Sequence, residues 1–146
     1  MHRPRPVAVN VALVAAVVLT GCGAQRSQHA ESTHRAGSKP AAERSDRAAI
    51  GDVIRRFNRA SLAADGGAQC ALIDPATLRY LEQIDEPCEI LQGGTLTPAS
   101  ARDVRSRKIT SITMTSDAAV AQTDGLGGPR DITMYCIAGR WYIRGP

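Results

Sequence analysis

Four cysteines carry the most reactive side chains of this sequence, and their surroundings decide which chemistry is open to them. They are Cys22, Cys70, Cys88 and Cys136. A thiol can act as a nucleophile, a metal ligand or half of a disulfide, and its neighbours select among these roles. Histidine is the usual partner for the first two roles, but residues 45–146 contain none. Cys-His catalysis, Ser-His-Asp catalysis and histidine-based zinc sites are therefore excluded from that segment.

Cys22 comes at the end of an N-terminal segment that has the layout of a secretory signal peptide. Residues 1–6 are basic, residues 7–19 form an apolar run of 13 residues, and small residues follow. A membrane-spanning helix needs about 20 apolar residues, so this run is too short to be a comfortable anchor by itself. We therefore predict that this segment directs export of the chain.

The Leu-Thr-Gly-Cys motif that ends at Cys22 resembles the lipobox of bacterial lipoproteins. The resemblance implies transfer of diacylglycerol to the Cys22 thiol and removal of residues 1–21 as a lipoprotein signal peptide. Two or three acyl chains, such as palmitate, would then hold the protein on the extracytoplasmic face of the cell membrane. The alternative is an ordinary secreted protein that is cleaved near Ala24 and loses Cys22.

The net positive charge of the chain lies in its N-terminal segments and not in the predicted folded domain. Residues 22–44 are polar and lack large apolar side chains, so we predict a flexible tether there. Of the net charge of +4, residues 1–21 and 22–44 contribute +2 each, whereas residues 45–146 hold 12 basic and 12 acidic residues. A nucleic-acid-binding domain usually carries its basic patch on the folded part, so we expect no nucleic-acid partner.

The first half of the predicted domain has helical signals. Apolar residues recur at helical spacing from Ile50 to Phe57, which predicts a long helix that begins at Asp46, is capped by Ser45 and stops at residues 66–67. Asp74-Pro75 indicates a helix cap followed by the first helical residue, and Glu86-Pro87 and Thr97-Pro98 are similar starts. We therefore predict three short helices, over residues 75–84, 87–92 and 98–103.

The second half of the predicted domain alternates with the period of two that is typical of strands. We predict strands over residues 108–114, 118–123, 131–137 and 140–144, with a glycine-rich connection before the third. No helix separates them, so the sheet should be an antiparallel meander. The expected fold class is α+β, with a long N-terminal helix and short helices packed on a four-stranded antiparallel sheet.

Three cysteines lie in the predicted domain and allow three disulfide pairings. Export places them in an oxidising compartment, where cysteine pairs usually bond. We favour Cys70–Cys88 because these residues bracket the helix predicted at 75–84. Cys136 is then left over as a buried free thiol on the apolar side of its strand, which it shares with Ile132 and Met134. A reactive or intermolecular thiol is the alternative. The spacings fit no zinc knuckle, so we expect no metal site.

The stretch from Cys70 to Leu81, followed by Cys88, resembles a pattern in small lipoproteins of GC-rich bacteria. Residues 117–120 and 139–145 match the later strands of those proteins. The resemblance implies a nuclear-transport-factor-two-like (cystatin-like) domain, in which a curved antiparallel sheet cradles a helix, and it implies the Cys70–Cys88 bridge. It implies little about activity, since that fold carries enzymes and binding modules alike.

Two charged clusters could bind ions but have simpler interpretations. The acidic cluster could serve acid–base chemistry or a weak Ca²⁺ site, although a solvated helix junction is the expected state. The basic run could contact lipid headgroups or an anionic ligand, although a solvated start of a strand is expected. The acidic cluster consists of Glu82, Asp85, Glu86 and Glu89, and the basic run of Arg102, Arg105, Arg107 and Lys108.

The aromatic residues supply the remaining candidates for a site. Phe57, Tyr80, Tyr135 and Trp141 could line a concave pocket for a small apolar or lipid-like ligand. We predict a lipid-anchored, extracytoplasmic domain without catalytic residues or a cofactor, which binds a small ligand or an envelope protein. The alternatives are an enzyme that uses carboxylates and tyrosine in a pocket of the sheet, and an accessory regulator of an envelope enzyme.

Overall fold

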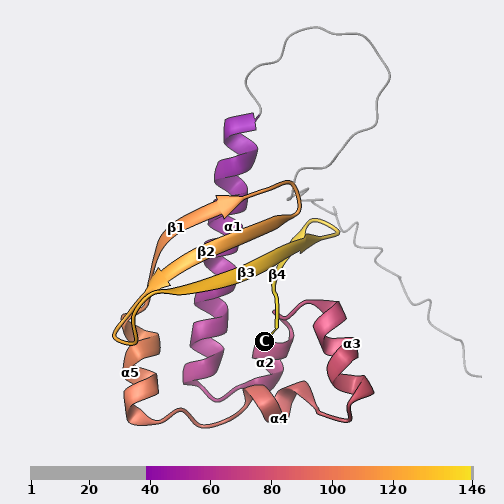
Figure 1. Cartoon of the computed structure of the whole chain (residues 1–146), viewed down its shortest axis with the longest axis vertical. Helices are drawn as coiled ribbons and strands as arrows, with labels where there is room; N and C mark the ends of the chain where they lie inside the picture. Colours follow the sequence, from indigo (N-terminus) through magenta and orange to yellow (C-terminus); the bar gives the residue numbers. More distant parts are fainter. Residues whose placement is uncertain (1–38, 146) are drawn as a thin grey trace, which may run out of the picture.

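The computed structural model describes residues 39–145, in which five helices precede four strands (Figure 1). The predicted signal peptide, Cys22 and most of the predicted tether lie outside these residues. The strands form one antiparallel sheet in the order β1-β2-β3-β4. The α+β class and the antiparallel meander predicted from the sequence are therefore confirmed.

The sheet consists of four strands whose ends differ from the predicted ends by at most one residue. They are β1 (Lys108–Met114), β2 (Ala118–Asp124), β3 (Arg130–Ile137) and β4 (Arg140–Ile143). Ala121 of β2 is paired with Ile112 on one side and Ile132 on the other, so small and branched apolar residues share one face. The last turn is tight because Ala138 and Gly139 both have positive φ, as primed hairpin turns require.

Helix α1 runs from Lys39 to Leu62, so it begins earlier than the predicted start at Asp46. Ser45 lies inside the helix and does not cap it, and the last residues of the predicted tether are helical. Proline at the second position and the alanines after it favour a helix start there. An ion pair between Arg47 and Glu43, 2.9 Å apart and one turn along the helix, supports this first segment.

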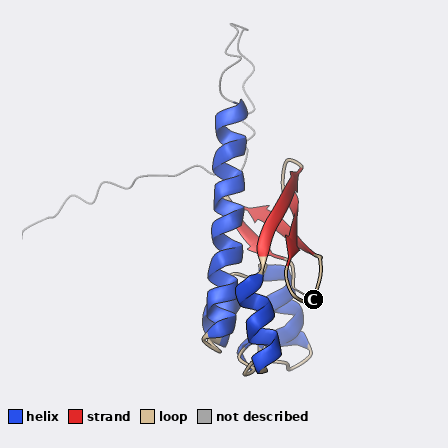
Figure 2. Ribbon diagram, turned by 90° about the vertical axis from the view of Figure 1, so that its left-hand side faces the viewer, coloured by secondary structure: helices blue, strands red, loops and turns tan. Residues whose placement is uncertain are grey.

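The main core lies between α1 and one face of the sheet. Figures 1 and 2 show α1 crossing that face, and Ile50 and Ile54 of α1 are buried in one cluster with Ala121 and Met134 of the sheet. Trp141 is 5% exposed in the same cluster, and its indole N–H donates to the buried Asp46 carboxylate at 3.3 Å. The helix is thus fixed to the sheet by apolar burial and by a polar contact.

Three short helices form a second, smaller core beside the C-terminal half of α1. They are α2 (Gly66–Cys70), α3 (Pro75–Gln83) and α4 (Cys88–Gln92). Cys70 of α2 and Cys88 of α4 are buried with Ile73 in this core, and Phe57 of α1 packs against it. Figure 2 shows them beyond the end of the sheet and not on its face, where we had predicted them. The sequence analysis also missed α2, which begins where glycines were expected only to end a helix.

Asp74 joins the short helices to the last strand. It caps α3 as predicted, since its carboxylate accepts hydrogen bonds from the backbone N–H groups of Ala76 and Thr77, both at 3.0 Å. The same carboxylate accepts from the Thr77 hydroxyl at 2.6 Å and from the Gly145 N–H at 3.4 Å. The Asp74 N–H donates to the carbonyl of Ile143 at 2.9 Å. One buried residue therefore satisfies polar groups of a helix start and a strand end.

We expect Asp74→Ala to lower the free energy of unfolding by about 2 kcal/mol near neutral pH, because a helix cap and charged hydrogen bonds are lost. Burial raises the pKa of Asp74, but the hydrogen bonds from Thr77, Gly145 and Ala76 outweigh it and hold the pKa below 3.8. This carboxylate therefore contributes stability above 3.8 that is lost as the pH falls through its pKa in the folded protein. Urea unfolding should show the difference between wild type and variant shrinking below pH 3.8, and an unchanged difference would contradict the assignment.

Candidate functional site

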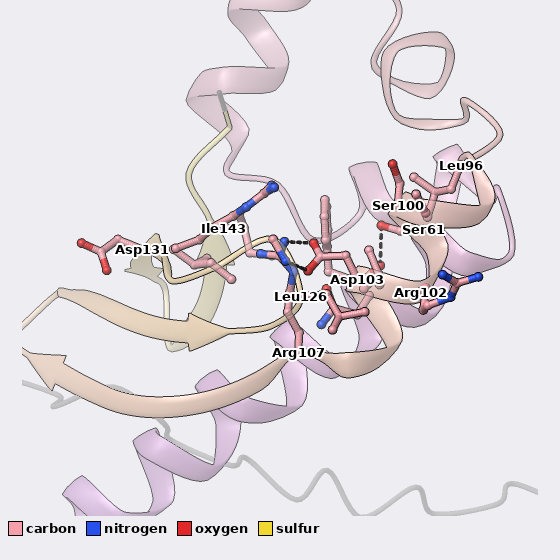
Figure 3. Close-up of a pocket in the computed structure, with 16 residues that line it drawn as sticks. Ser61, Leu96, Ser100, Arg102, Asp103, Arg107, Leu126, Asp131 and Ile143 are labelled. Atoms are coloured by element: carbon pink, nitrogen blue, oxygen red, sulfur yellow. Dashed lines mark hydrogen bonds and ion pairs between the residues drawn. The ribbon is translucent and has the colours of Figure 1, made fainter.

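A groove of about 790 Å³ lies where α1, α5 (Pro98–Ser106), the β2–β3 loop and the sheet meet (Figure 3). This volume falls in the range of small-molecule binding sites, about 300–1,000 Å³. Its floor is apolar and comes from four elements, and much of its rim is exposed. The floor residues are Phe57 of α1, Val104 of α5, Ile132 of β3 and Ile143 of β4.

Helix α5 forms one wall of the groove and is longer than predicted. Thr97 caps it, since its hydroxyl accepts a hydrogen bond from the Ser100 N–H at 3.1 Å, and Pro98 occupies the first turn. The helix continues to Ser106, past the end predicted at residue 103. This extra turn carries Val104 into the groove and places Arg107 directly after it.

The glycine-rich β2–β3 loop forms the opposite wall and is held against the end of α5. The Gly127 N–H donates to an Asp103 carboxylate oxygen at 2.7 Å, and the Leu126 N–H donates to the Ser106 hydroxyl at 3.1 Å. A Cβ atom at Gly125 would lie 2.9 Å from the Asp103 carboxylate, so the close approach needs glycine there. This segment, predicted only as a connection between strands, is therefore a wall of the groove that hydrogen bonds hold in place.

Asp103 is the electrostatic centre of this wall. Its carboxylate also forms an ion pair with Arg107, and both side chains are largely buried. The hydrogen bond from Gly127 and that from Arg107 lower the pKa of Asp103. Asp103 is therefore ionised at neutral pH, and its oxygens are already occupied. Such a carboxylate is poorly suited to exchange a proton with a substrate.

Two cations remain on the rim of the groove. Arg102 and Arg130 line it, both are exposed, and neither forms an ion pair with another described residue. Asp131 also lines the groove, but Figure 3 shows its carboxylate pointing away from Asp103 and Arg107. The groove thus combines an apolar floor with a positively charged rim.

The structure does not bring the four predicted pocket aromatics together. Phe57 lines the groove, whereas Trp141 is packed between α1 and the sheet. Tyr80 and Tyr135 meet at a separate hollow of about 330 Å³ that Asp74 also lines. The separation has a simple cause: α1 fills the apolar face of the sheet, while strand alternation places Tyr135 on the other face.

The two charged clusters lie in different surroundings. The acidic side chains are exposed and border a hollow of about 370 Å³ beside Cys88. In the part of the chain that the structure describes, no group of three or more His, Cys, Asp or Glu residues could hold a metal ion. The basic run is split, because Arg102 and Arg107 line the groove whereas Arg105 and Lys108 do not.

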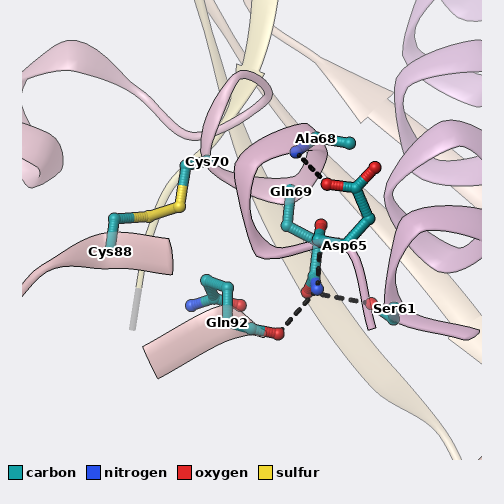
Figure 4. The surroundings of a disulfide bond; sticks show 7 residues. All are labelled: Ser61, Asp65, Ala68, Gln69, Cys70, Cys88 and Gln92. Atoms are coloured by element: carbon teal, nitrogen blue, oxygen red, sulfur yellow. Dashed lines mark hydrogen bonds between the residues drawn. A yellow bond between two sulfur atoms is a disulfide. The ribbon is translucent and has the colours of Figure 1, made fainter. Parts of the chain in front are cut away.

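The predicted Cys70–Cys88 disulfide is confirmed and connects α2 to α4, with the Cα atoms 6.0 Å apart (Figure 4). Beside it, the buried Gln69 amide donates to the Gln92 carbonyl at 2.6 Å and accepts from the Ser61 hydroxyl at 3.0 Å. These contacts join the C-terminal end of α1 to both short helices.

The prediction of a free thiol at Cys136 is wrong. Cys136 is disulfide-bonded, and no cysteine among residues 39–145 is free. Strand alternation could predict on which face Cys136 lies, but it holds no information about a bonding partner distant in sequence.

Comparison of the chain with protein-family models finds no match, and comparison with curated proteins and with solved structures finds no significant similarity. Among the described residues, no helix combines the length and apolar character needed to cross a membrane. The residues that line the groove are therefore the basis for assigning a function. Arg130, Val104 and Ile132 also line the groove but were not predicted as site residues, because no local motif marks them.

Proposed function

We propose that the chain is an exported, lipid-anchored protein whose domain binds a small ligand in the groove without catalysis. The lipobox that ends at Cys22 supports the anchor. The Cys70–Cys88 disulfide supports export, because such bonds persist mainly in oxidising compartments. The long α1 across one face of a four-stranded meander supports a nuclear-transport-factor-two-like domain.

The groove is the observation that carries the binding function. Its apolar floor offers burial to a small ligand, and hydrogen bonds from Gly127 and Leu126 hold its loop wall in place before any ligand enters. Catalysis by a carboxylate is less well supported, since Asp103 is committed to Gly127 and Arg107. A preformed apolar groove with an occupied carboxylate suits binding better than proton transfer.

The anchor is tested by following lipid on Cys22. In a bacterial host that processes lipoproteins, we expect the full chain to incorporate labelled palmitate and Cys22→Ser to incorporate none. Cys70→Ser is the matched control and should still be labelled. Peptide mapping without reduction tests the opposite outcome, because one sulfur cannot carry both a lipid and a disulfide. A disulfide between Cys22 and Cys136 would overturn the anchor.

Binding in the groove is tested by filling it. Ala99 is exposed on α5 and lines the groove, so Ala99→Trp should occupy space there with little effect on folding. We expect it to weaken binding of octanoate and 1-octanol at least about tenfold, a change of roughly 1.4 kcal/mol. Ala48→Trp, at an exposed position of α1 outside the groove, is the control and should bind normally.

The measurement is isothermal titration of the full chain in phosphatidylcholine nanodiscs, with empty nanodiscs as the blank. Short amphiphiles are used because they partition weakly into the bilayer. If neither compound binds, or if Ala99→Trp and Ala48→Trp bind equally well, the groove is not the binding site.

A further inference from the structure

We propose that the ligand of the groove is a single-chain amphiphile with one anionic head. This inference rests on the binding function proposed above and names the class of ligand. The apolar chain would lie along the floor, and the head would lie at the rim beside Arg102 and Arg130. A fatty acid carboxylate and the phosphate of a lysolipid share this chemistry.

The apolar floor of the groove favours a ligand with an apolar chain. Phe57, Ile132 and Ile143 line the groove from three different elements, and Ile143 is 9% exposed, so the surface is part of the folded core. Leu126 stands at the edge with 68% of its surface exposed, although large apolar side chains are usually buried. An apolar chain in the groove would cover it.

Arg102 and Arg130 favour a ligand whose head is negatively charged. Arg107 is paired with Asp103, so the cations of the rim are Arg102 on α5 and Arg130 at the start of β3. Arg130 also interacts electrostatically with the Asp103 carboxylate without forming an ion pair. Guanidinium groups form paired hydrogen bonds with carboxylate and phosphate oxygens. Figure 3 shows the Asp131 carboxylate on the opposite side of the groove from Arg102, so it does not neutralise that guanidinium group.

The same arrangement disfavours other heads. A cationic amphiphile would meet Arg102 and Arg130 with like charge. A neutral alcohol would occupy the floor but leave both guanidinium groups to solvent. The structure therefore predicts an order of affinity for chains of equal length: anion, then alcohol, then cation.

The test uses four compounds with the same eight-carbon chain: octanoate, octyl phosphate, 1-octanol and octylammonium. They are titrated into the full chain in phosphatidylcholine nanodiscs, again with an empty-nanodisc blank. We expect at least one anion to bind ten or more times tighter than 1-octanol, about the effect of one charge-assisted hydrogen bond. Preference for octanoate identifies a fatty-acid-like ligand, and preference for octyl phosphate identifies a lysolipid-like one.

Matched variants test whether the anionic head of the ligand binds at Arg102 and Arg130. The double variant R102Q/R130Q should reduce the ratio of anion to alcohol affinity to about one. The control R105Q/R140Q removes the same charge at exposed residues outside the groove and should keep the wild-type ratio. If both double variants lose the preference for the anion to the same extent, the proposed head position is wrong.

The outcomes separate this inference from the function on which it rests. If 1-octanol binds as tightly as both anions and Ala99→Trp abolishes all binding, the groove is a binding site but the anionic class is wrong. If octylammonium binds best, the class is also wrong. If none of the four compounds binds, the proposed binding function fails together with this inference.

Discussion

The double variant C70A/C88A is expected to lower the free energy of unfolding by about 3 kcal/mol. The disulfide closes a loop with a sequence separation of 18 residues, and removing it restores conformational freedom to the unfolded chain. It also connects α2 to α4, two helices of only five residues each, which are too short to be stable alone. Urea unfolding of the oxidised proteins measures the loss.

Single variants provide the internal control for this prediction. Either Cys70→Ala or Cys88→Ala breaks the same bond, so each should lose nearly as much stability as the double variant. Losses that add between the two sites would mean that the side chains contribute by packing and not as a disulfide. A double variant within about 1 kcal/mol of wild type would contradict the proposed stabilisation.

A second large effect is expected at Gly66, where α2 packs directly on α4. A Cβ atom there would lie 2.3 Å from the carbonyl oxygen of Glu89 and 2.9 Å from the backbone nitrogen of Gly93. Both are backbone atoms, so relief requires movement of the whole helix. We expect Gly66→Ala to cost roughly 3 kcal/mol, which exceeds the gain of about 1 kcal/mol that alanine offers in a helix.

Gly94→Ala is the matched control for this prediction. It lies directly after Gly93, a Cβ atom would have no neighbour within 4 Å, and its φ is not positive. We expect stability to be unchanged or raised by up to about 1 kcal/mol, because alanine restricts the unfolded chain. Thermal and urea unfolding compare both variants. A Gly66→Ala protein as stable as wild type would show that α2 and α4 are not in backbone contact.

Loss of the disulfide and Gly66→Ala should both affect the groove, because Phe57 belongs to the small core and also to the groove floor. Phe57 packs against the small core of Cys70, Ile73 and Cys88, and it also lines the floor of the groove. Loosening the short helices should therefore disturb the floor, although none of the residues changed in these variants lines it. Octanoate binding by Gly66→Ala should weaken, while Gly94→Ala should bind as wild type does.

Local signals account for the parts of the fold that the sequence analysis predicted correctly. Asp74 before Pro75 and Thr97 before Pro98 are helix starts because the side chain and the proline act on the next turn only. Strand alternation placed Ile132 and Met134 together on one face, and the Cys70–Cys88 pair could be favoured because it brackets a short helix. Each of these depends on residues that are close in sequence.

The wrong predictions concern features that residues close in sequence do not determine. The state of Cys136 and the position of the short helices each depend on distant parts of the chain. A helix signal shows which face is apolar, but the surface that covers that face is chosen by the whole fold.

The α+β order, the strands, the caps of α3 and α5 and the neutral charge of residues 45–146 can all be predicted from the sequence. Tertiary packing places the groove beside α5 and keeps the four aromatics apart. Arg102 and Arg130 share that groove because the glycine-rich loop folds back onto Asp103. The physical reason is that packing selects such long-range contacts, whereas a turn or a cap is set by its immediate neighbours.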